Sequence, residues 1–132
     1  MTDQTMTIRE MCEQYDVTAR ALRFYEAKEL LFPIREGTRR LFTRSDRARL
    51  SLILRGKRYG FSLEEIRQLL DLWDGGKGRM VQLERACEVA ERHLAEMEAQ
   101  RAELDRTIKD LKDQLAWGRA ELAQDGTRAN AA

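Results

Sequence analysis

The sequence predicts a mainly α fold: a winged helix-turn-helix domain of four helices and a small β-hairpin, followed by a long coiled-coil helix. Two short amphipathic segments lead into a hairpin that carries Pro33 and Gly37. Three glycines between positions 75 and 78 then mark a boundary. Beyond them, apolar side chains recur at alternating spacings of three and four residues, as in coiled coils. We therefore expect a domain at 5–74 and a separate helix at 79–118.

Residues 8–27 have the pattern of a helix-turn-helix. The first helix has a stripe at helical spacing, made of Ile8, Met11, Cys12 and Tyr15. Thr18 is suited to cap the second helix, in which Leu22 and Tyr25 share a face. The basic side chains of that helix and its end project elsewhere: Arg20, Arg23 and Lys28. A short helix with basic groups near its N-terminus fits a DNA groove, so this segment predicts DNA binding.

Residues 33–43 predict the hairpin, which forms the wing. Pro33 blocks helix continuation, and Gly37 separates two short runs that place Ile34 and Leu41 on facing strands. Its tip carries three arginines, Arg35, Arg39 and Arg40. Because a two-stranded hairpin is marginally stable alone, it must pack on the helices. A basic hairpin in this position is placed to grip phosphate.

Two further helices complete the domain. The third begins at Thr43 or Ser45, and the fourth begins with a capping box formed by Ser62 and Glu65. The net charge of +1 hides an uneven distribution, because residues 20–58 contain twelve Lys/Arg and only four Asp/Glu. This asymmetry favours a polyanion as the partner of the first half of the chain.

The apolar stripe after the glycines predicts the coiled-coil helix. It consists of Met80, Leu83, Cys87, Ala90, Leu94, Met97, Arg101, Leu104, Ile108, Leu111 and Leu115, with Arg101 as the only charged member. A helix over 79–118 is on the order of 60 Å long at 1.5 Å per residue, too long to bury its stripe on so small a domain. We therefore expect a homodimer, while a helix that folds back on its own domain stays the alternative. Residues 119–132 are small and polar and predict a flexible tail.

Charges beside the stripe favour an antiparallel pair. With Leu83 at heptad position d, the e positions are Glu84, Glu91, Glu98, Asp105, Lys112 and Arg119. Antiparallel packing sets the acidic start of this series against the basic end of the partner's series. A parallel pair would stack Arg101 on its twin in the core, which is unfavourable.

With both halves in view, the chain resembles the MerR family of bacterial transcription regulators. The matching residues are Thr7-Ile8, Val17-Thr18, Leu22-Arg23-Phe24-Tyr25-Glu26, Leu30-Leu31, Arg40-Leu41-Phe42 and the run from Tyr59 to Ile66. The resemblance implies a winged helix-turn-helix whose protomers pair through an antiparallel coiled coil. It further implies binding to double-stranded promoter DNA and activation by untwisting that DNA, so that RNA polymerase is affected only indirectly. Simple repression remains the alternative.

The resemblance also assigns site residues. The DNA-binding set is Thr18, Arg20 and Arg23 on the recognition helix, Tyr25 beside the phosphates, Arg39 and Arg40 on the wing, and Lys57 and Arg58 on the DNA backbone. The dimerisation set is Leu83, Cys87, Leu94, Met97, Arg101, Leu104, Ile108, Leu111 and Leu115. Two departures from the family pattern stand out. Asp16 replaces a turn glycine, which Asp tolerates because it can adopt a left-handed conformation, and Thr38-Arg39-Arg40 replaces Gly-Tyr-Arg.

Other features bear on what the protein senses and where it acts. Residues 47–58 resemble a sub-branch that regulates branched-chain amino acid and acyl-CoA breakdown. No thiol follows Cys87 and His93 stands alone, so we expect no metal and no cofactor, and the effector is not identified by the sequence.

Cys12 and Cys87 on apolar stripes are expected to be buried, reduced thiols. Without a signal peptide or an apolar run long enough to span a membrane, the chain is expected to be cytoplasmic.

Other classes of function are less well supported by the sequence. An enzyme is not expected, because His93 lies on the coiled-coil flank and the carboxylates are spread along helical faces without forming a pocket. A coiled-coil interaction or adaptor protein is the rival from another class. An architectural DNA-bending factor of the excisionase kind is a third reading, and the long helix counts against it.

Overall fold

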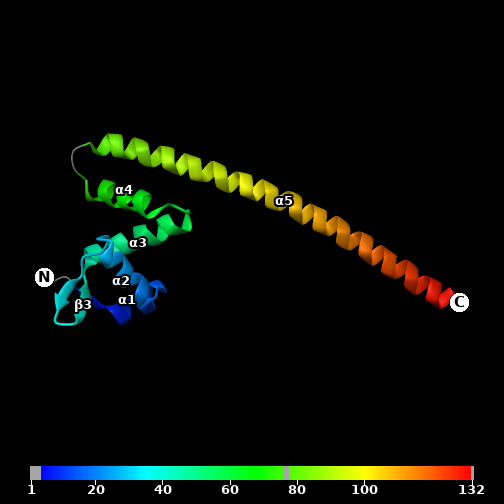
Figure 1. Cartoon of the computed structure of the whole chain (residues 1–132), viewed down its shortest axis with the longest axis horizontal. Coiled ribbons are helices and arrows are strands. Elements are labelled where there is room, and N and C mark those ends of the chain that lie inside the picture. The colour runs from blue at the N-terminus through cyan, green and yellow to red at the C-terminus, as the bar shows by residue number, and fades with distance from the viewer. Residues whose placement is uncertain (1–3, 76–77, 132) are drawn as a thin grey trace. The chain divides into compact units, whose positions relative to one another are not determined.

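A computed structural model describes residues 4–75 and 78–131 of the chain. The elements, coloured in chain order in Figure 1, are β1 (Met6–Thr7), α1 (Ile8–Tyr15), α2 (Ala19–Ala27), β2 (Ile34–Glu36), β3 (Arg39–Phe42), α3 (Arg44–Arg58), α4 (Leu63–Asp74) and α5 (Arg79–Ala131). Contacts divide the chain into two units, Met1–Ala90 and Glu91–Ala132. The mainly helical fold with a small wing and a long last helix is therefore confirmed.

The helix-turn-helix is defined by side chains that satisfy the first backbone N–H groups of each helix. Thr7 and Glu10 form a capping box at the start of α1, with hydrogen bonds of 2.9 and 3.2 Å. The side-chain oxygen of Thr18 accepts from the N–H of Ala21 at 3.0 Å and so caps α2, as predicted. Asp16 ends α1 with φ 52° and ψ 50°, the left-handed conformation expected of the residue that replaces a turn glycine. The turn thus orients α2 against α1.

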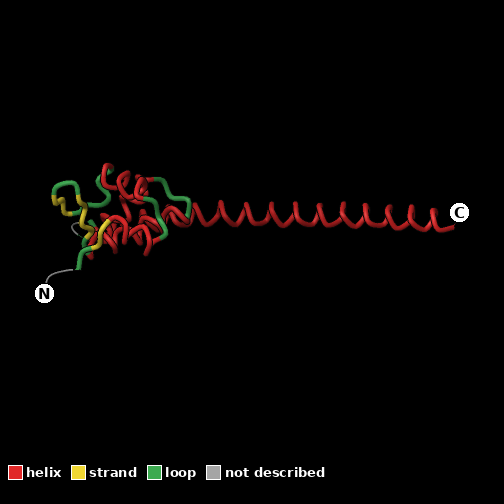
Figure 2. Tube along the Cα trace, turned by 90° about the horizontal axis from the view of Figure 1, so that it is seen from below, coloured by secondary structure: helices red, strands yellow, loops and turns green. Residues whose placement is uncertain are grey.

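The wing belongs to a three-stranded antiparallel sheet in the order β1-β3-β2. Ile34 pairs with Leu41, as the sequence predicts, and Glu36 pairs with Arg39 on either side of the tip. The strand β1 was not predicted. Its two residues are too few to show an alternating pattern, and they pair with Leu41 and Phe42 at the far end of β3. The strands, yellow in Figure 2, lie together at one edge of the helical unit, and β1 extends the sheet on the β3 side of the hairpin.

The core of the first unit gathers apolar side chains from every helix up to α4. Its buried members are Met11, Leu22, Tyr25, Leu30, Leu31, Phe42, Leu50, Ile53, Ile66 and Leu70. Leu30 and Leu31 lie in the connection from α2 to the wing, and they place that connection beneath α2. The recognition helix and the wing therefore share one core.

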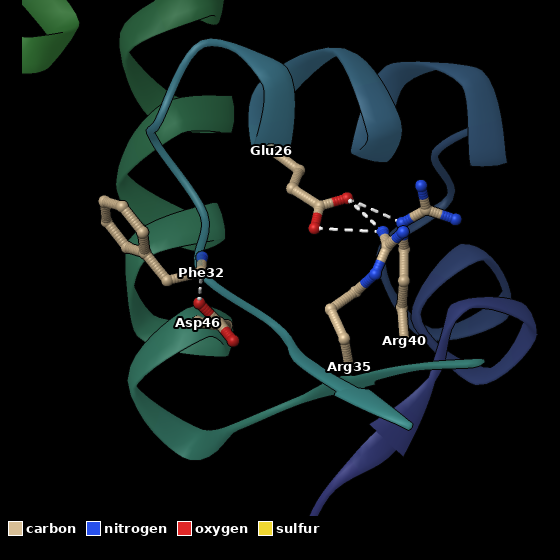
Figure 3. A network of polar contacts seen from close by, with 5 residues as sticks. All are labelled: Glu26, Phe32, Arg35, Arg40 and Asp46. Atoms are coloured by element: carbon tan, nitrogen blue, oxygen red, sulfur yellow. Dashed lines mark hydrogen bonds and ion pairs between the residues drawn. The ribbon is translucent and has the colours of Figure 1, made fainter. Parts of the chain in front are cut away.

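Two polar side chains are buried beside this core and fix the connection between α2 and the wing. Asp46, only 2% exposed, accepts from the N–H of Phe32 at 2.9 Å (Figure 3) and from the N–H of its cap residue Thr43 at 3.0 Å. Arg49 donates to the carbonyl of Leu30 at 2.8 Å and to Asp74 at 2.9 Å. A lone buried charge is costly, and these contacts satisfy both groups.

The last helix departs from the sequence prediction. We expected it to end at Gly118 and residues 119–132 to form a flexible tail, but α5 continues to Ala131. A single glycine in a helix interior costs about 1 kcal/mol, and strong helix formers on both sides, such as Ala116, Ala120 and Leu122, offset that cost. The helix therefore does not end at Gly118 as predicted, whereas the flexibility of residues 119–132 stays a prediction. No helix among the described residues is long and apolar enough to cross a membrane.

The packing of α3 on α4 generates a stability prediction. A Cβ atom added at the buried Gly56 would lie 2.7 Å from Cγ1 of Ile66, which has no exposed surface. We expect Gly56→Ala to lower the free energy of unfolding by about 1–3 kcal/mol, because overpacking outweighs the better helix propensity of alanine. Urea denaturation followed by far-ultraviolet circular dichroism measures the change.

Gly118→Ala is the matched control for this prediction. A Cβ at Gly118 meets nothing within 4 Å, so the same substitution should stabilise the helix by roughly 0.5–1 kcal/mol. Equal effects of the two substitutions would contradict the packing argument.

Candidate nucleic-acid interface

The recognition helix α2 presents a mixed surface of cations and one aromatic ring. Its apolar face buries Leu22 and Tyr25, whereas Arg20, Arg23 and Phe24 are exposed. Phe24 is 43% exposed, and the ammonium group of Lys28 lies 5.7 Å from its ring centroid. The exposed face therefore offers guanidinium donors and an apolar ring, the groups that read base edges and thymine methyl groups in a major groove.

A first hollow of about 400 Å³ lies beside the N-terminal half of α2. It is lined by Thr18, Arg20, Ala21, Phe24, Tyr25, Lys57 and Leu63. The ammonium group of Lys57 lies 6.0 Å from the ring centroid of Tyr25, so the end of α3 supplies a cation at the back of α2. Thr18, Arg20, Tyr25 and Lys57, four of the predicted DNA-binding residues, thus line one surface.

A second hollow of about 300 Å³ lies between α2, the start of α1 and the wing. It is lined by Thr7, Ile8, Arg23, Thr38, Arg39 and Arg40. Three more predicted site residues, Arg23, Arg39 and Arg40, come together here. Positive charge therefore flanks α2 on two sides, an arrangement suited to neighbouring phosphates of a duplex.

Arg39 has an electrostatic partner beside this hollow. The backbone N–H of Thr7 donates to the carboxylate of Glu10 and holds the pKa of that group below its usual range. The hydroxyl of Thr7 acts in the same direction, and the positive charge of Arg39 adds a smaller lowering of the same pKa. The exposed guanidinium of Arg39 therefore lies near the first turn of α1.

The wing is joined to α2 by an ion-pair cluster centred on Glu26 (Figure 3). Nε of Arg40 lies 2.6 Å from Oε1 of Glu26, and Nη1 of Arg35 lies 3.3 Å from each oxygen of the same carboxylate. The side chains of Glu26 and Arg40 are each 22% exposed, whereas that of Arg35 is 50% exposed. One carboxylate thus holds two strands of the wing against the recognition helix.

This cluster distinguishes the arginines of the wing. Arg40 makes the shorter and more buried contact, so its guanidinium acts within the protein. Arg35 makes the longer contact at a more exposed position, and Arg39 is exposed at the tip. Arg35 and Arg39 are therefore the wing cations with the most freedom to reach a phosphate.

The remaining predicted contacts lie at the end of α3 and within the core. Lys57 and Arg58 occupy the last turn of α3, where both are exposed and complement the negative end of the helix dipole. Tyr25, in contrast, is 2% exposed and its ring packs in the core. Tyr25 can therefore contact a phosphate only through the small part of its side chain that is exposed at the first hollow.

Sequence reasoning missed three residues that shape this surface. Glu26 anchors the wing, Arg49 fixes the connection below α2, and Arg67 donates from α4 to the carbonyl of Lys28 at 2.5 Å. Each of these contacts joins residues separated by at least fourteen positions. No helical or strand periodicity reports such a pairing.

The predicted dimerisation residues share an exposed stripe on α5. Leu83, Leu94, Met97, Leu104, Ile108, Leu111 and Leu115 are all exposed in the single chain. Cys12 is half-buried and packs against the core, whereas Cys87 is exposed in the single chain, and its burial in a dimer stays a prediction. Apolar side chains repeated along an otherwise charged helix need a partner surface. Among the described residues, no three His, Cys, Asp or Glu side chains group as a metal site.

Comparisons with known proteins agree with this geometry. A family model described as "MerR HTH family regulatory protein" matches residues 6–73, and one described as "MerR, DNA binding" matches residues 47–114. The regulator ZntR of Escherichia coli K12 is 34% identical over 111 residues, which cover 80% of this chain and 77% of ZntR.

Two solved structures are also similar. The structure of HiNmlR, a MerR family regulator lacking the sensor domain and bound to promoter DNA, has a TM-score of 0.62 and 29% identity, and the match covers 80% of this chain and 79% of that one. The lead(II) complex of PbrR691 from Ralstonia metallidurans CH34 has a TM-score of 0.59 and 32% identity, covering 82% and 84%.

The first family model covers just over half of the chain, and it spans the capped helix pair, the wing and the two helices that support them. The protein therefore belongs to the MerR family of helix-turn-helix transcriptional regulators.

Proposed function

We propose that this protein binds promoter DNA as a homodimer and regulates transcription by distorting the DNA between its two half-sites. The observation that carries the proposal is the surface around α2, where exposed Arg20 and Arg23 are flanked by two basic hollows. Capped by Thr18, α2 has the dimensions of a helix that enters a major groove. The promoter-bound relative supports the choice of DNA as the partner.

The dimer is proposed from the apolar stripe of α5. Two copies pair antiparallel along this stripe, and their recognition helices enter successive major grooves of an inverted repeat. The wings contact the flanking backbone. When the two half-sites are held at a fixed separation, binding energy can pay for untwisting the DNA between them. RNA polymerase then responds to the altered promoter without contacting the regulator.

Binding to the upstream region of the protein's own gene tests the proposal. Fluorescence anisotropy across a series of salt concentrations should show a sequence-specific complex whose affinity falls steeply as salt rises. The slope of log affinity against log salt approaches one unit for each phosphate neutralised. If the affinity does not respond to salt, DNA is not the partner, and the alternative of a coiled-coil interaction or adaptor protein remains.

Individual phosphate contacts generate a second prediction. Arg23→Ala or Arg39→Ala should weaken binding to all DNA sequences and lower the salt slope by about one unit, because each removes one exposed cation beside the second hollow. Arg106→Ala is the matched control. Arg106 is an exposed arginine of α5 that pairs with Glu103, and its loss should leave both quantities unchanged. Analytical ultracentrifugation confirms that each variant stays dimeric.

Arg20 generates a prediction about specificity. It is the second residue of α2 and is exposed, so its guanidinium can reach base edges. If it reads a guanine, Arg20→Ala should cost about 1–3 kcal/mol on the cognate site and much less on unrelated DNA. Titrations of both duplexes measure the difference. Equal losses on the two would assign Arg20 to the phosphate backbone.

The Glu26 cluster generates a prediction in which the affinities for cognate and for non-specific DNA change in opposite directions. Glu26→Gln removes the charge that holds Arg40 and Arg35, so the wing loses its fixed position and cognate affinity should fall about tenfold, the order expected when a charge-assisted hydrogen bond is lost. Non-specific affinity should rise, because one negative charge beside the polyanion is gone.

Glu36→Gln provides the control for this test. Glu36 is an exposed carboxylate on the same wing, so its substitution makes the same change in charge and leaves the Glu26 cluster intact. Both affinities should rise in this variant. A parallel rise of both affinities in Glu26→Gln would mean that the cluster does not position the wing.

We also infer, from the resemblance of residues 47–58 alone, that the target genes belong to branched-chain amino acid or acyl-CoA breakdown. Within this segment Arg49 and Lys57 make internal contacts, so the resemblance reflects a shared scaffold as well as any shared target. Transcript levels in a deletion strain, compared between growth with and without leucine as carbon source, test the assignment.

A further inference from the structure

Two helices of the first unit enclose a polar cleft that lies apart from the surface around α2. The first turns of α5 lie alongside α4 (Figure 1), and a cleft of about 90 Å³ lies between them. It is lined by Gln68 and Asp71 on α4 and by Gln82 and Arg85 on α5. All four residues belong to the first compact unit, which ends at Ala90. On each helix the two side chains are three residues apart, so each pair lies on one helical face.

The cleft also lies apart from the apolar stripe of α5. With Leu83 at heptad position d, Gln82 falls at position c and Arg85 at position f. These are outer positions of the heptad, away from the a and d residues that meet a partner helix. Pairing along the stripe therefore does not itself bury the two side chains that α5 contributes to the cleft.

Three polar groups at the cleft have no partner within the described part of the chain. The side-chain oxygen of Gln82 is buried and accepts no hydrogen bond there. The side chains of Asp71 and Arg85 are exposed, and neither forms a hydrogen bond or an ion pair with a described residue. One turn further along α4, in contrast, Asp74 pairs with Arg49 at 2.9 Å. The cleft therefore offers two acceptors and one cation that remain available to a ligand.

The opposite charges of Asp71 and Arg85 select the class of ligand. A purely cationic molecule would be attracted by Asp71 and repelled by Arg85, and an anion would meet the reverse. A molecule that carries a positive and a negative group satisfies both. An ammonium group has three N–H donors, which suit the carboxylate of Asp71 and the oxygen of Gln82. The guanidinium of Arg85 can bind a carboxylate through two parallel hydrogen bonds.

The size of the cleft narrows this class further. A cavity needs only about 10–15 Å³ to hold one water molecule, and an apolar cavity of roughly 150 Å³ holds benzene. The cleft, at about 90 Å³, is therefore larger than a single water site and suits a ligand with few atoms. An α-amino acid separates its ammonium and carboxylate groups by one carbon atom. Its main-chain groups thus combine both charges in a small volume.

A divalent cation fits these residues less well. Ca²⁺ takes about six to eight oxygen ligands, with carboxylates among them. Asp71 is the one carboxylate that lines the cleft, and Arg85 adds a positive charge beside it. Within 4–75 and 78–131, no three His, Cys, Asp or Glu side chains group as a metal site.

We propose that the cleft between α4 and α5 binds a free α-amino acid through its main-chain groups. The ammonium group donates to Asp71 and to the side-chain oxygen of Gln82, and the carboxylate accepts from Arg85. The amide of Gln68 lies at the same cleft and can bond either charged end. The side chain of the amino acid then extends through the open side of the cleft.

Isothermal titration calorimetry on the full-length protein tests the class of ligand. L-Alanine is the probe, L-alaninamide keeps the ammonium group without the carboxylate, and N-acetyl-L-alanine keeps the carboxylate without the ammonium group. L-Alanine should bind once per protomer, and each analogue at least about tenfold more weakly, because each loses a charge-assisted contact. If L-alanine gives no binding heat, water alone fills the cleft and the proposal is overturned. Equal binding of either analogue would also overturn it.

Charge-matched variants test the location of the site. Asp71→Asn and Arg85→Gln should each weaken L-alanine at least about tenfold, and both should fold normally because neither side chain has a partner among the described residues. The controls are Asp113→Asn and Arg106→Gln, which make the same changes in charge at exposed residues of α5. Circular dichroism checks the fold of all four. Equal losses in the variants and their controls would place L-alanine elsewhere and overturn the site.

The position of the cleft also predicts an effect on DNA, and this consequence rests on the proposed function. Asp71 lies one turn from Asp74, whose ion pair with Arg49 ties the end of α4 to α3. A ligand that joins α4 to α5 should therefore change the affinity for promoter DNA at least about threefold, measured by fluorescence anisotropy with and without saturating L-alanine.

The two kinds of measurement separate the possible failures. The calorimetry contains no DNA, so a protein that binds L-alanine but no promoter contradicts the proposed function and supports the site. Equal DNA affinities with and without L-alanine would overturn the coupling. An effect of L-alanine on DNA binding that persists in Asp71→Asn would overturn the site itself.

Discussion

The buried carboxylate of Asp46 is the interaction on which the rest of the DNA-binding unit depends. It caps α3 through Thr43 and at the same time accepts from the N–H of Phe32, fourteen residues earlier. This single group therefore joins the start of α3 to the connection that leads from α2 into the wing. The position of β2 follows from that connection, and the position of β2 brings Arg35 and its neighbour Arg40 on β3 to Glu26. A short hairpin can then act as a rigid wing.

Some arginines of residues 20–58 make contacts within the protein, whereas others are exposed. Fewer arginines are therefore available to bind DNA than the charge of this segment suggests. Arg40 is held by Glu26, Arg47 donates to the carbonyl of Gln4, and Arg49 joins Leu30 to Asp74. Arginine suits these tasks because its planar group donates in several directions while its stem packs against apolar surface. Net basicity of the segment therefore overstates its phosphate contacts, and the exposed set around α2 is the better guide.

Contacts between residues that are close in the sequence could be predicted from it. Contacts between residues that are far apart in the sequence were missed. The caps at Thr18 and Ser62 involve partners three residues away, so they could be read directly. The ion pair of Arg40 with Glu26 and the pairing of Met6 with Phe42 join segments by folding, and no periodic pattern reports them. The end of α5 was misplaced for another reason. One glycine was given more weight than the many helix formers around it.

The length of α5 bears on the proposed homodimer, because each residue of a continuous helix adds about 1.5 Å to its length. In the chain α5 follows α4, and the ion pair of Asp74 with Arg49 ties the end of α4 to α3. Contacts within the first unit then lead from the end of α4 through α3 to the connection below α2. Because that connection leads into the wing, the end of α4 is tied to the DNA-binding surface.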